Sequence, residues 1–212
     1  MTVIPEMPAI PTVISYNFYY ARPGNADAVL DQRLRASDVR VNLGLSRGRT
    51  TSKIQGAEDF ADVIWRLDFA DMSGQNADMS ARAESPAFEA IRHGMRKLYR
   101  RFERPLYAPC HHGSSRLLSV APEQLLQLYG IYCEASVNAA VHEIITPFAV
   151  SHGLRAAALI SGGENIPRII CEIGDAVIPQ QAMAELQRLP VRIEHSVWQT
   201  KDSDQATDPA VK

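Results

Sequence analysis

The chain contains little cysteine, and none of the spacings in which cysteine usually binds metal or carries out redox chemistry. It has three cysteines among 212 residues, Cys110, Cys133 and Cys171, and no CxxC pair. An odd number without that spacing does not fit a disulfide-stapled or zinc-binding scaffold. We therefore expect reduced, buried thiols and a cytoplasmic protein.

Strong charge of one sign and long apolar runs are also missing. The net charge is only -2, so nothing predicts nucleic acid or an anionic membrane as a partner. No apolar run approaches the roughly 20 residues that span a bilayer. The first residues lack both the basic and the apolar part of a signal peptide. We expect no membrane association.

Motifs for metals and common cofactors are absent as well. The sequence has no P-loop, no GxGxxG run and no readable Ser-His-Asp arrangement. His142-Glu143 is not followed by a second histidine four residues later, and His111-His112 are adjacent rather than spaced as two ligands on one face. We expect no metal and no cofactor.

What the sequence does contain is a unit that occurs twice. In the segment 12–30, a run rich in β-branched and aromatic residues leads into the turn Pro23-Gly24 and then a helical pattern. A weaker copy occupies 125–144. The rest of each half completes the order β-α-β-β-α-β, which is the ferredoxin-like pattern.

The boundaries predicted from these patterns are as follows. The chain divides into an N-terminal arm 1–9, repeat one 10–110, a connector 111–123, repeat two 124–200 and a disordered tail 201–212. In repeat one we expect strands at 12–20, 47–55, 62–70 and 106–110, a flexible loop at 71–84, and helices at 25–43 and 85–104. In repeat two we expect strands at 125–133, 155–160, 168–173 and 191–198, and helices at 136–148 and 179–189, the first kinked by Pro147.

Two motifs of the first half resemble a known group. The run YNFYYARPGNADAVL and the later ESPAFEAIRH resemble the antibiotic biosynthesis monooxygenases of the dimeric α/β-barrel superfamily. There, a strand ends in a Pro-Gly-like turn, and a Ser-Pro-x-Phe-like element, here at 85–88, opens the second helix. The resemblance covers 13–110 by motif and 125–198 by pattern.

This resemblance implies the architecture. The fold class is α+β, with two tandem ferredoxin-like repeats packing sheet to sheet as an α/β barrel. Members of the superfamily usually pair two such domains around a pocket, and a tandem chain could close that barrel within itself. Whether two chains pair further, as a homodimer through an exposed edge strand, stays open.

We expect the more polar face of each first strand to line the barrel lumen. In the first repeat this face comprises Val13, Ser15, Asn17 and Tyr19, and in the second Leu125, Gln127, Tyr129 and Ile131. For the strand 62–70 two alternatives remain. The alternation favours Arg66 and Asp68 facing inward, whereas the resemblance favours Trp65 and Phe69.

The haem-degrading branch of the superfamily uses an asparagine on the first strand, a tryptophan on the third and a histidine on the second helix. Asn17 matches the asparagine, but the other two positions fall on Phe69 and Arg92. His93 lies one residue late and is therefore rotated by about 100° around the helix. The resemblance thus disfavours haem degradation.

The cofactor-independent branch fits the residues better. Its enzymes let a substrate phenolate or enolate supply electrons to oxygen, while the protein positions the substrate and helps to remove a proton. We predict such a monooxygenase, acting on a small aromatic or polyketide-like molecule in the barrel lumen. The expected catalytic residues are Asn17, Trp65 and His195, and the expected substrate-binding residues are Ser15, Tyr19, Arg66, Phe69 and Tyr129. The alternative is a non-catalytic ligand-binding or structural barrel.

Overall fold

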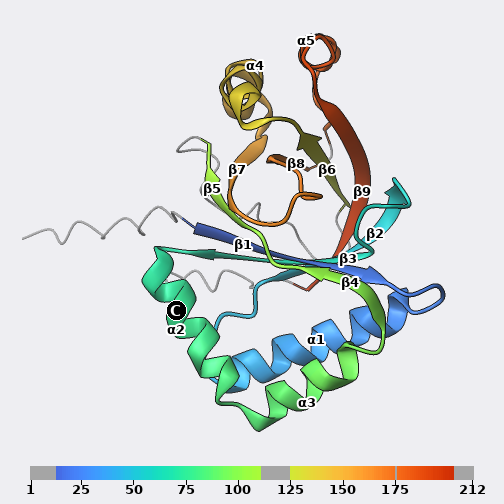
Figure 1. Ribbon diagram of the computed structural model, residues 1–212, viewed down its shortest axis with the longest axis vertical. Coiled ribbons are helices and arrows are strands. Elements are labelled where there is room, and N and C mark those ends of the chain that lie inside the picture. The colour runs from blue at the N-terminus through green and yellow to red at the C-terminus, as the bar shows by residue number, and fades with distance from the viewer. Residues whose placement is uncertain (1–12, 111–124, 175, 203–212) are drawn as a thin grey trace, which may run out of the picture.

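The computed structural model describes residues 13–110, 125–174 and 176–202, and these form two βαββαβ units (Figure 1). The arm 1–9 and the connector 111–123 predicted from the sequence lie outside the described residues, as do residues 203–212 of the predicted tail. The first two residues of that tail, Lys201 and Asp202, are not disordered but end the last strand. No helix in the described ranges has both the length and the apolar character needed to cross a membrane.

The first unit contains an additional helix and a divided last strand. Its elements are β1 (Val13–Ala21), α1 (Ala26–Asn42), β2 (Arg49–Gly56), β3 (Val63–Phe69), α2 (Met72–Ala83), α3 (Pro86–Met95), β4 (Tyr99–Glu103) and β5 (Leu106–Pro109). The turn after β1 is formed as the Pro-Gly pair predicts, with Gly24 at a φ of 79°.

The second unit repeats the order with a shorter last helix. Its elements are β6 (Leu125–Tyr132), the 3-10 turn η2 (Ala135–Val137), α4 (Asn138–His152), β7 (Arg155–Ser161), β8 (Ile169–Ile173), α5 (Gln180–Leu186) and β9 (Arg192–Asp202). Pro147 lies inside α4, which continues through it to His152.

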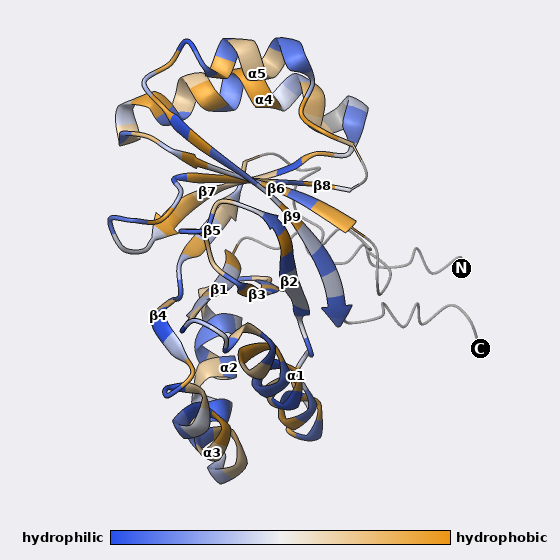
Figure 2. Ribbon diagram, turned by 90° about the vertical axis from the view of Figure 1, so that its right-hand side faces the viewer, coloured by the Kyte–Doolittle hydropathy of each residue, from blue (hydrophilic) through white to orange (hydrophobic). Residues whose placement is uncertain are grey.

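The strands close into a barrel within this one chain. Their order is β3-β2-β9-β6-β8-β7-β5-β1, and β1 pairs again with β3 to complete the ring. The two units meet at the antiparallel seams β2–β9 and β5–β7. Helices α1, α2 and α3 cover one side of the barrel, and α4 and α5 cover the opposite side (Figures 1 and 2). The predicted fold class, two ferredoxin-like units forming an α/β barrel, is confirmed.

Two predicted boundaries in the first unit were wrong. The polar stretch 71–84 is helix α2, which starts where the Asp71 carboxylate accepts a hydrogen bond from the Gly74 N–H. The helix that begins with Ser85 as its N-cap ends at Met95 instead of Arg104, because residues 99–103 pair with β1 as strand β4.

The assignment of the strand faces also needs correction. The barrel interior holds Ile14, Tyr16, Phe18 and Tyr20 of β1, clustered with side chains from β3, β5, β6, β7, β8 and β9. Tyr19 instead packs with Val29 of α1 and Met95 of α3, so the face with Val13, Ser15, Asn17 and Tyr19 lies under the helices.

The same reversal applies in the second unit. Leu126 and Leu128 face the interior, while Tyr129 and Ile131 pack against α4 and α5. Between the two alternatives left open for β3, the structure selects Arg66 and Asp68 for the interior, because Trp65 packs on the helix side. The expectation that the more polar face lines the lumen was wrong, because polar groups in the interior form hydrogen bonds with one another.

A charged cluster occupies the barrel interior. The Glu172 carboxylate of β8 accepts hydrogen bonds from Arg49, Arg66 and the Tyr16 hydroxyl, and all four side chains are at most 2% exposed. Arg66 also pairs with Asp68 at 2.9 Å. Aromatic rings and this cluster therefore occupy the interior that we had expected to hold a ligand.

Candidate functional site

The candidate site is a cavity of about 160 Å³ between the sheet of the first unit and its helices. It lies on the outer side of β1, outside the barrel interior. Residues of β1, α1, the end of α2, α3 and β4 contribute to its walls. They are Asn17, Tyr19, Arg33, Ala36, Arg82, Phe88, Ile91, Arg92, Met95, Arg96, Tyr99, Phe102 and Arg104.

Asn17 and Tyr19 form the floor of the cavity on β1. Both are buried because they face α1 and α3 from a strand whose two sides are covered. The Asn17 amide donates to the Tyr19 hydroxyl at 3.3 Å, and its carbonyl oxygen accepts from Arg104 Nε at 3.2 Å. The amide is therefore fixed in one orientation between a phenol and a guanidinium.

Five arginines give the cavity a positive lining, although the whole chain is slightly acidic. Arg82 pairs with Asp78 at 2.7 Å, and the exposed Arg92 pairs with Glu89. Burial lowers the pKa of Arg104, and the nearby Arg82 lowers it further. The site therefore favours a negatively charged guest.

Apolar and aromatic groups form the remaining walls. Tyr19, Tyr99 and Phe102 form one aromatic group, with the Tyr19 and Phe102 ring centres 5.0 Å apart. Phe88 lies beneath the Arg82 guanidinium at 5.3 Å. An apolar body with an anionic group would match both parts of this lining.

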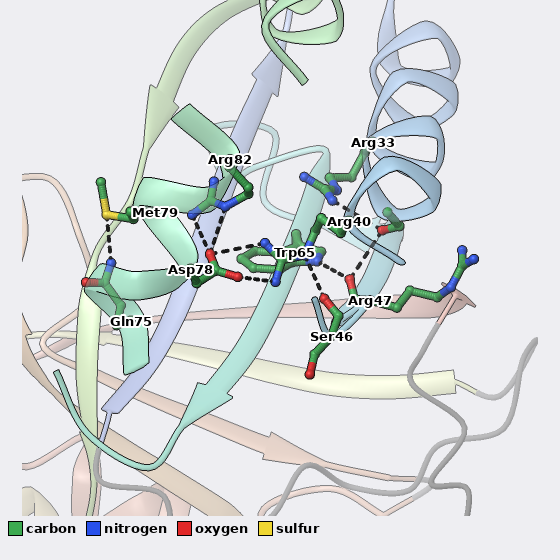
Figure 3. Close-up of polar contacts among 10 residues, drawn as sticks. Arg33, Arg40, Ser46, Arg47, Trp65, Gln75, Asp78, Met79 and Arg82 are labelled. Atoms are coloured by element: carbon green, nitrogen blue, oxygen red, sulfur yellow. Dashed lines mark hydrogen bonds and ion pairs between the residues drawn. The ribbon is translucent and has the colours of Figure 1, made fainter. Parts of the chain in front are cut away.

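Trp65 supports the site from behind. It lies directly across from Asn17 in the β1–β3 pairing, but it does not line the cavity. Its indole N–H donates to the Arg47 carbonyl at 2.9 Å, and the guanidinium groups of Arg33 and Arg40 lie 5.0 and 4.7 Å from its ring (Figure 3). Trp65 thus holds two arginines of α1 in place.

Asp78 of α2 completes this support. Its carboxylate pairs with Arg40 at 2.5 Å and with Arg82 at 2.7 Å, and thereby joins α2 to α1 (Figure 3). The same contacts explain why the polar segment 72–83 is helical: its buried residues are Gln75, Asp78 and Arg82, a polar stripe at helical spacing.

The residues predicted from the sequence separate into three places. Asn17 and Tyr19 line the cavity, and Trp65 lies beside Asn17. Ser15 and Phe69 occupy the same face of the sheet but lie outside the lining, with Ser15 buried and Phe69 partly buried. Arg66 lies in the barrel interior.

Tyr129 and His195 belong to the second unit. Their rings stack with centres 4.5 Å apart, and His195 also contacts the Gln127 side chain at 2.6 Å. His195 is exposed, and the burial of part of its side chain lowers its pKa. Neither residue lines the cavity.

Sequence reasoning missed the arginines of the cavity. None of the five was among the residues predicted for the site. A signal existed, because Val29, Arg33, Ala36 and Arg40 have the spacing of one buried helical stripe, and all four are buried in α1.

Two other cavities are less suited to an aromatic guest. They measure about 290 and 360 Å³ and share Ala26 and Asp62 in their linings. Neither lining contains an aromatic side chain, and Asp62 already accepts a hydrogen bond from the Ala21 N–H and pairs with Lys53.

The donor groups of the cavity do not fit a haem iron. Its described lining contains no histidine and no cysteine, and the position that the resemblance had assigned to histidine is Arg92. The Tyr19 hydroxyl is engaged by Asn17. Throughout the described ranges, no three His, Cys, Asp or Glu side chains gather as a metal site would require.

Comparison with known proteins identifies the fold. No family description and no curated protein sequence matches the chain. Among solved structures, an anthrone oxidase-like protein is similar with a TM-score of 0.60 at 9% identity, covering 92% of this chain and 93% of that one. A candidate monooxygenase from Fusobacterium nucleatum is similar with a TM-score of 0.52 at 7% identity, over 92% and 94%.

A third similar structure is that of a candidate chlorite dismutase, with a TM-score of 0.50 at 14% identity over 91% and 96% of the two chains. At these identities the likeness concerns the fold. It agrees with the closed barrel and the two repeated units described above. The chain is therefore a protein of the dimeric α/β-barrel fold, with both barrel halves in one polypeptide.

Proposed function

We propose that the cavity between the first sheet and its helices binds a small aromatic or polyketide-like molecule as its anion and promotes the reaction of that anion with oxygen without a bound cofactor. The observation that carries this proposal is the buried arginine lining beside Asn17 and Tyr19. The similarity to an anthrone oxidase-like protein and to a candidate monooxygenase is consistent with it.

The chemistry requires only the substrate and oxygen. An activated CH₂ group beside an aromatic ketone loses a proton to give an enolate, which supplies electrons to O₂. One oxygen atom becomes a carbonyl on that carbon, and the other leaves as water with the two hydrogens. Because the substrate provides all four electrons, no external reductant is needed.

In this proposal the protein stabilises the enolate. Arg104 would bind the developing oxyanion, and Asn17, held between Arg104 and Tyr19, would orient it. The described lining offers no carboxylate or imidazole as a base, so its contribution is to lower the substrate's pKa electrostatically.

The cavity volume bounds the size of the guest. A volume of about 160 Å³ is close to the roughly 150 Å³ of an apolar cavity that holds one benzene ring. One ring would therefore be enclosed, while the rest of a larger molecule would lie by the exposed Arg92 and Arg96.

Oxygen uptake with anthrone as substrate tests this proposal. We expect one O₂ consumed per anthrone without added haem, flavin or metal. Asn17→Ala should lower kcat/KM roughly 10- to 100-fold, as expected for loss of a hydrogen bond to a charged group. Ser15→Ala is the matched control, since Ser15 is buried on the same strand face but lies outside the lining. Equal rates for both variants, or a strict need for added cofactor, would contradict the proposal.

The lack of a base in the described lining supports a second candidate, a carrier that binds the anion without turnover. A carrier would bind the anionic form stoichiometrically and consume no oxygen. Measuring anthrone binding and oxygen uptake on the same sample separates the two candidates, because only the enzyme shows both.

A further inference from the structure

The arginines around the cavity carry more positive charge than the carboxylates paired with them neutralise. Arg33, Arg40 and Arg82 are buried, and Arg104 is partly buried. Asp78 is the only carboxylate paired with any of these four in the described part of the chain, and it serves Arg40 and Arg82. This leaves Arg33 and Arg104 without a carboxylate partner among the described residues.

Arg33 is the arginine whose buried positive charge has the least compensation. It is 2% exposed, and its Nε atom has no hydrogen-bond partner among the described residues. One terminal nitrogen donates to the Ser37 hydroxyl at 3.2 Å, and the guanidinium lies over Trp65. A buried cation without a counter-charge is costly, so an anion beside Arg33 would be strongly stabilised.

Arg104 occupies a different wall of the cavity. It follows β4, its Nε donates to the Asn17 carbonyl, and its guanidinium lies 5.4 Å from the Phe102 ring. Arg33 extends instead from α1 toward Trp65 of β3. The two uncompensated cations therefore come from separate elements and have separate neighbours.

These arginines lower one another's pKa values. Burial lowers the pKa of Arg40, and Arg82 and Arg33 lower it further, against the opposing effect of Asp78. Arg104 is affected by Arg82 and Arg92 in the same way. The positive charges around the cavity therefore destabilise one another.

We propose that the ligand carries two anionic groups on one aromatic frame: a carboxylate bound by Arg33 and an ionised hydroxyl bound by Arg104 and Asn17. The flat guanidinium of Arg33, with a free Nε–H, suits the two oxygens of a carboxylate. The Arg104 Nε–H is already given to the Asn17 carbonyl, so its terminal N–H groups and the Asn17 amide remain to bind the oxyanion of the hydroxyl. This inference rests on the proposed function, because it names the substrate class of the same cavity as hydroxyaryl carboxylates.

Three probes that differ by one group test the proposal. They are 4-nitrophenol, 2-nitrobenzoate and 5-hydroxy-2-nitrobenzoate, which carries both groups. Isothermal titration gives each affinity, and the yellow colour of a nitrophenolate reports ionisation of the hydroxyl. We expect 5-hydroxy-2-nitrobenzoate to bind at least tenfold more tightly than either single-group probe, with a gain in yellow absorbance at constant pH.

The variants then assign each group to its arginine. In Arg33→Met, 5-hydroxy-2-nitrobenzoate should bind no more tightly than 4-nitrophenol, while the affinity for 4-nitrophenol should stay within about twofold of the wild-type value. In Arg104→Met, 5-hydroxy-2-nitrobenzoate should bind no more tightly than 2-nitrobenzoate, and its yellow absorbance should no longer increase on binding. Arg192→Met, an exposed arginine of the second unit, is the matched control and should change none of the affinities.

The affinities of the wild-type protein for the three probes can be compared even if a variant does not fold. If 5-hydroxy-2-nitrobenzoate binds no more tightly than 4-nitrophenol, the two-anion inference is wrong while the proposed function stands. If Arg33→Met weakens the binding of 4-nitrophenol and of 5-hydroxy-2-nitrobenzoate by the same factor, Arg33 does not bind the carboxylate. If none of the three probes binds the folded wild-type protein, the proposed function fails together with the inference.

Discussion

Replacing Glu172 by glutamine should weaken the barrel more than any exposed charge substitution. The carboxylate belongs to β8 of the second unit, whereas its partners Arg49, Arg66 and Tyr16 belong to the first. It therefore joins the two units inside the closed sheet. Glu172→Gln preserves the shape of the side chain but leaves two buried guanidinium groups with less counter-charge.

The magnitude follows from the titration of this group. Burial alone would raise the pKa of Glu172, but Arg49 and Arg66 outweigh it and lower the pKa from 4.5 to about 2. At about 1.4 kcal/mol per pH unit, this shift corresponds to about 3 kcal/mol in favour of the folded state. Removing one partner of a buried ion pair costs about 3–5 kcal/mol in other proteins, which agrees.

The pH dependence has a definite sign. The folded pKa of Glu172 lies below the unfolded value, so its stabilisation is fully present above about pH 5 and is lost as the pH falls toward 2. The difference in unfolding free energy between wild type and Glu172→Gln should therefore shrink across this window.

Urea denaturation at several pH values measures this difference. Glu89→Gln is the control, because Glu89 is 47% exposed and its pair with Arg92 should contribute less than about 1 kcal/mol. An unfolding free energy of Glu172→Gln within about 1 kcal/mol of wild type at pH 7, or a difference that does not change with pH, would contradict this role of Glu172.

Three further substitutions test other contacts. Gly48→Ala should destabilise the fold by about 1–3 kcal/mol in thermal denaturation, because Gly48 has a φ of 73° and a Cβ there would lie 2.4 Å from the Trp65 indole nitrogen. Asp78→Asn should cost about 3–5 kcal/mol of unfolding free energy by leaving Arg40 and Arg82 unpaired. Tyr107→Phe should cost about 1 kcal/mol, since it removes the buried 2.9 Å bond to the Pro167 carbonyl.

The sequence patterns predicted the two repeated units, and the family resemblance predicted that they form a barrel. The β-branched and aromatic run before Pro23-Gly24 is β1, and the Ser85-Pro86 start of α3 is correct to the residue. Helix α2 was missed because its buried stripe is polar, and apolar periodicity cannot detect helices held by ion pairs such as Asp78 with Arg40.

The faces of β1 could not be assigned from polarity. All nine residues of the strand are buried, so neither side shows the contrast that solvent normally imposes. The interior also accommodates polar groups, because Glu172 satisfies Tyr16 from the other unit, and a contact between residues 156 positions apart leaves no local pattern. Asn17 and Tyr19 were therefore correctly predicted to lie side by side on one face of β1, but that face was assigned to the wrong side of the sheet.

A crystal structure of the protein with 5-hydroxy-2-nitrobenzoate would show where this ligand binds. We expect ligand density between β1, α1 and α3, with the carboxylate at Arg33 and the phenolic oxygen at Arg104 and Asn17. Density inside the barrel beside Glu172, or against the Tyr129–His195 stack of the second unit, would contradict it.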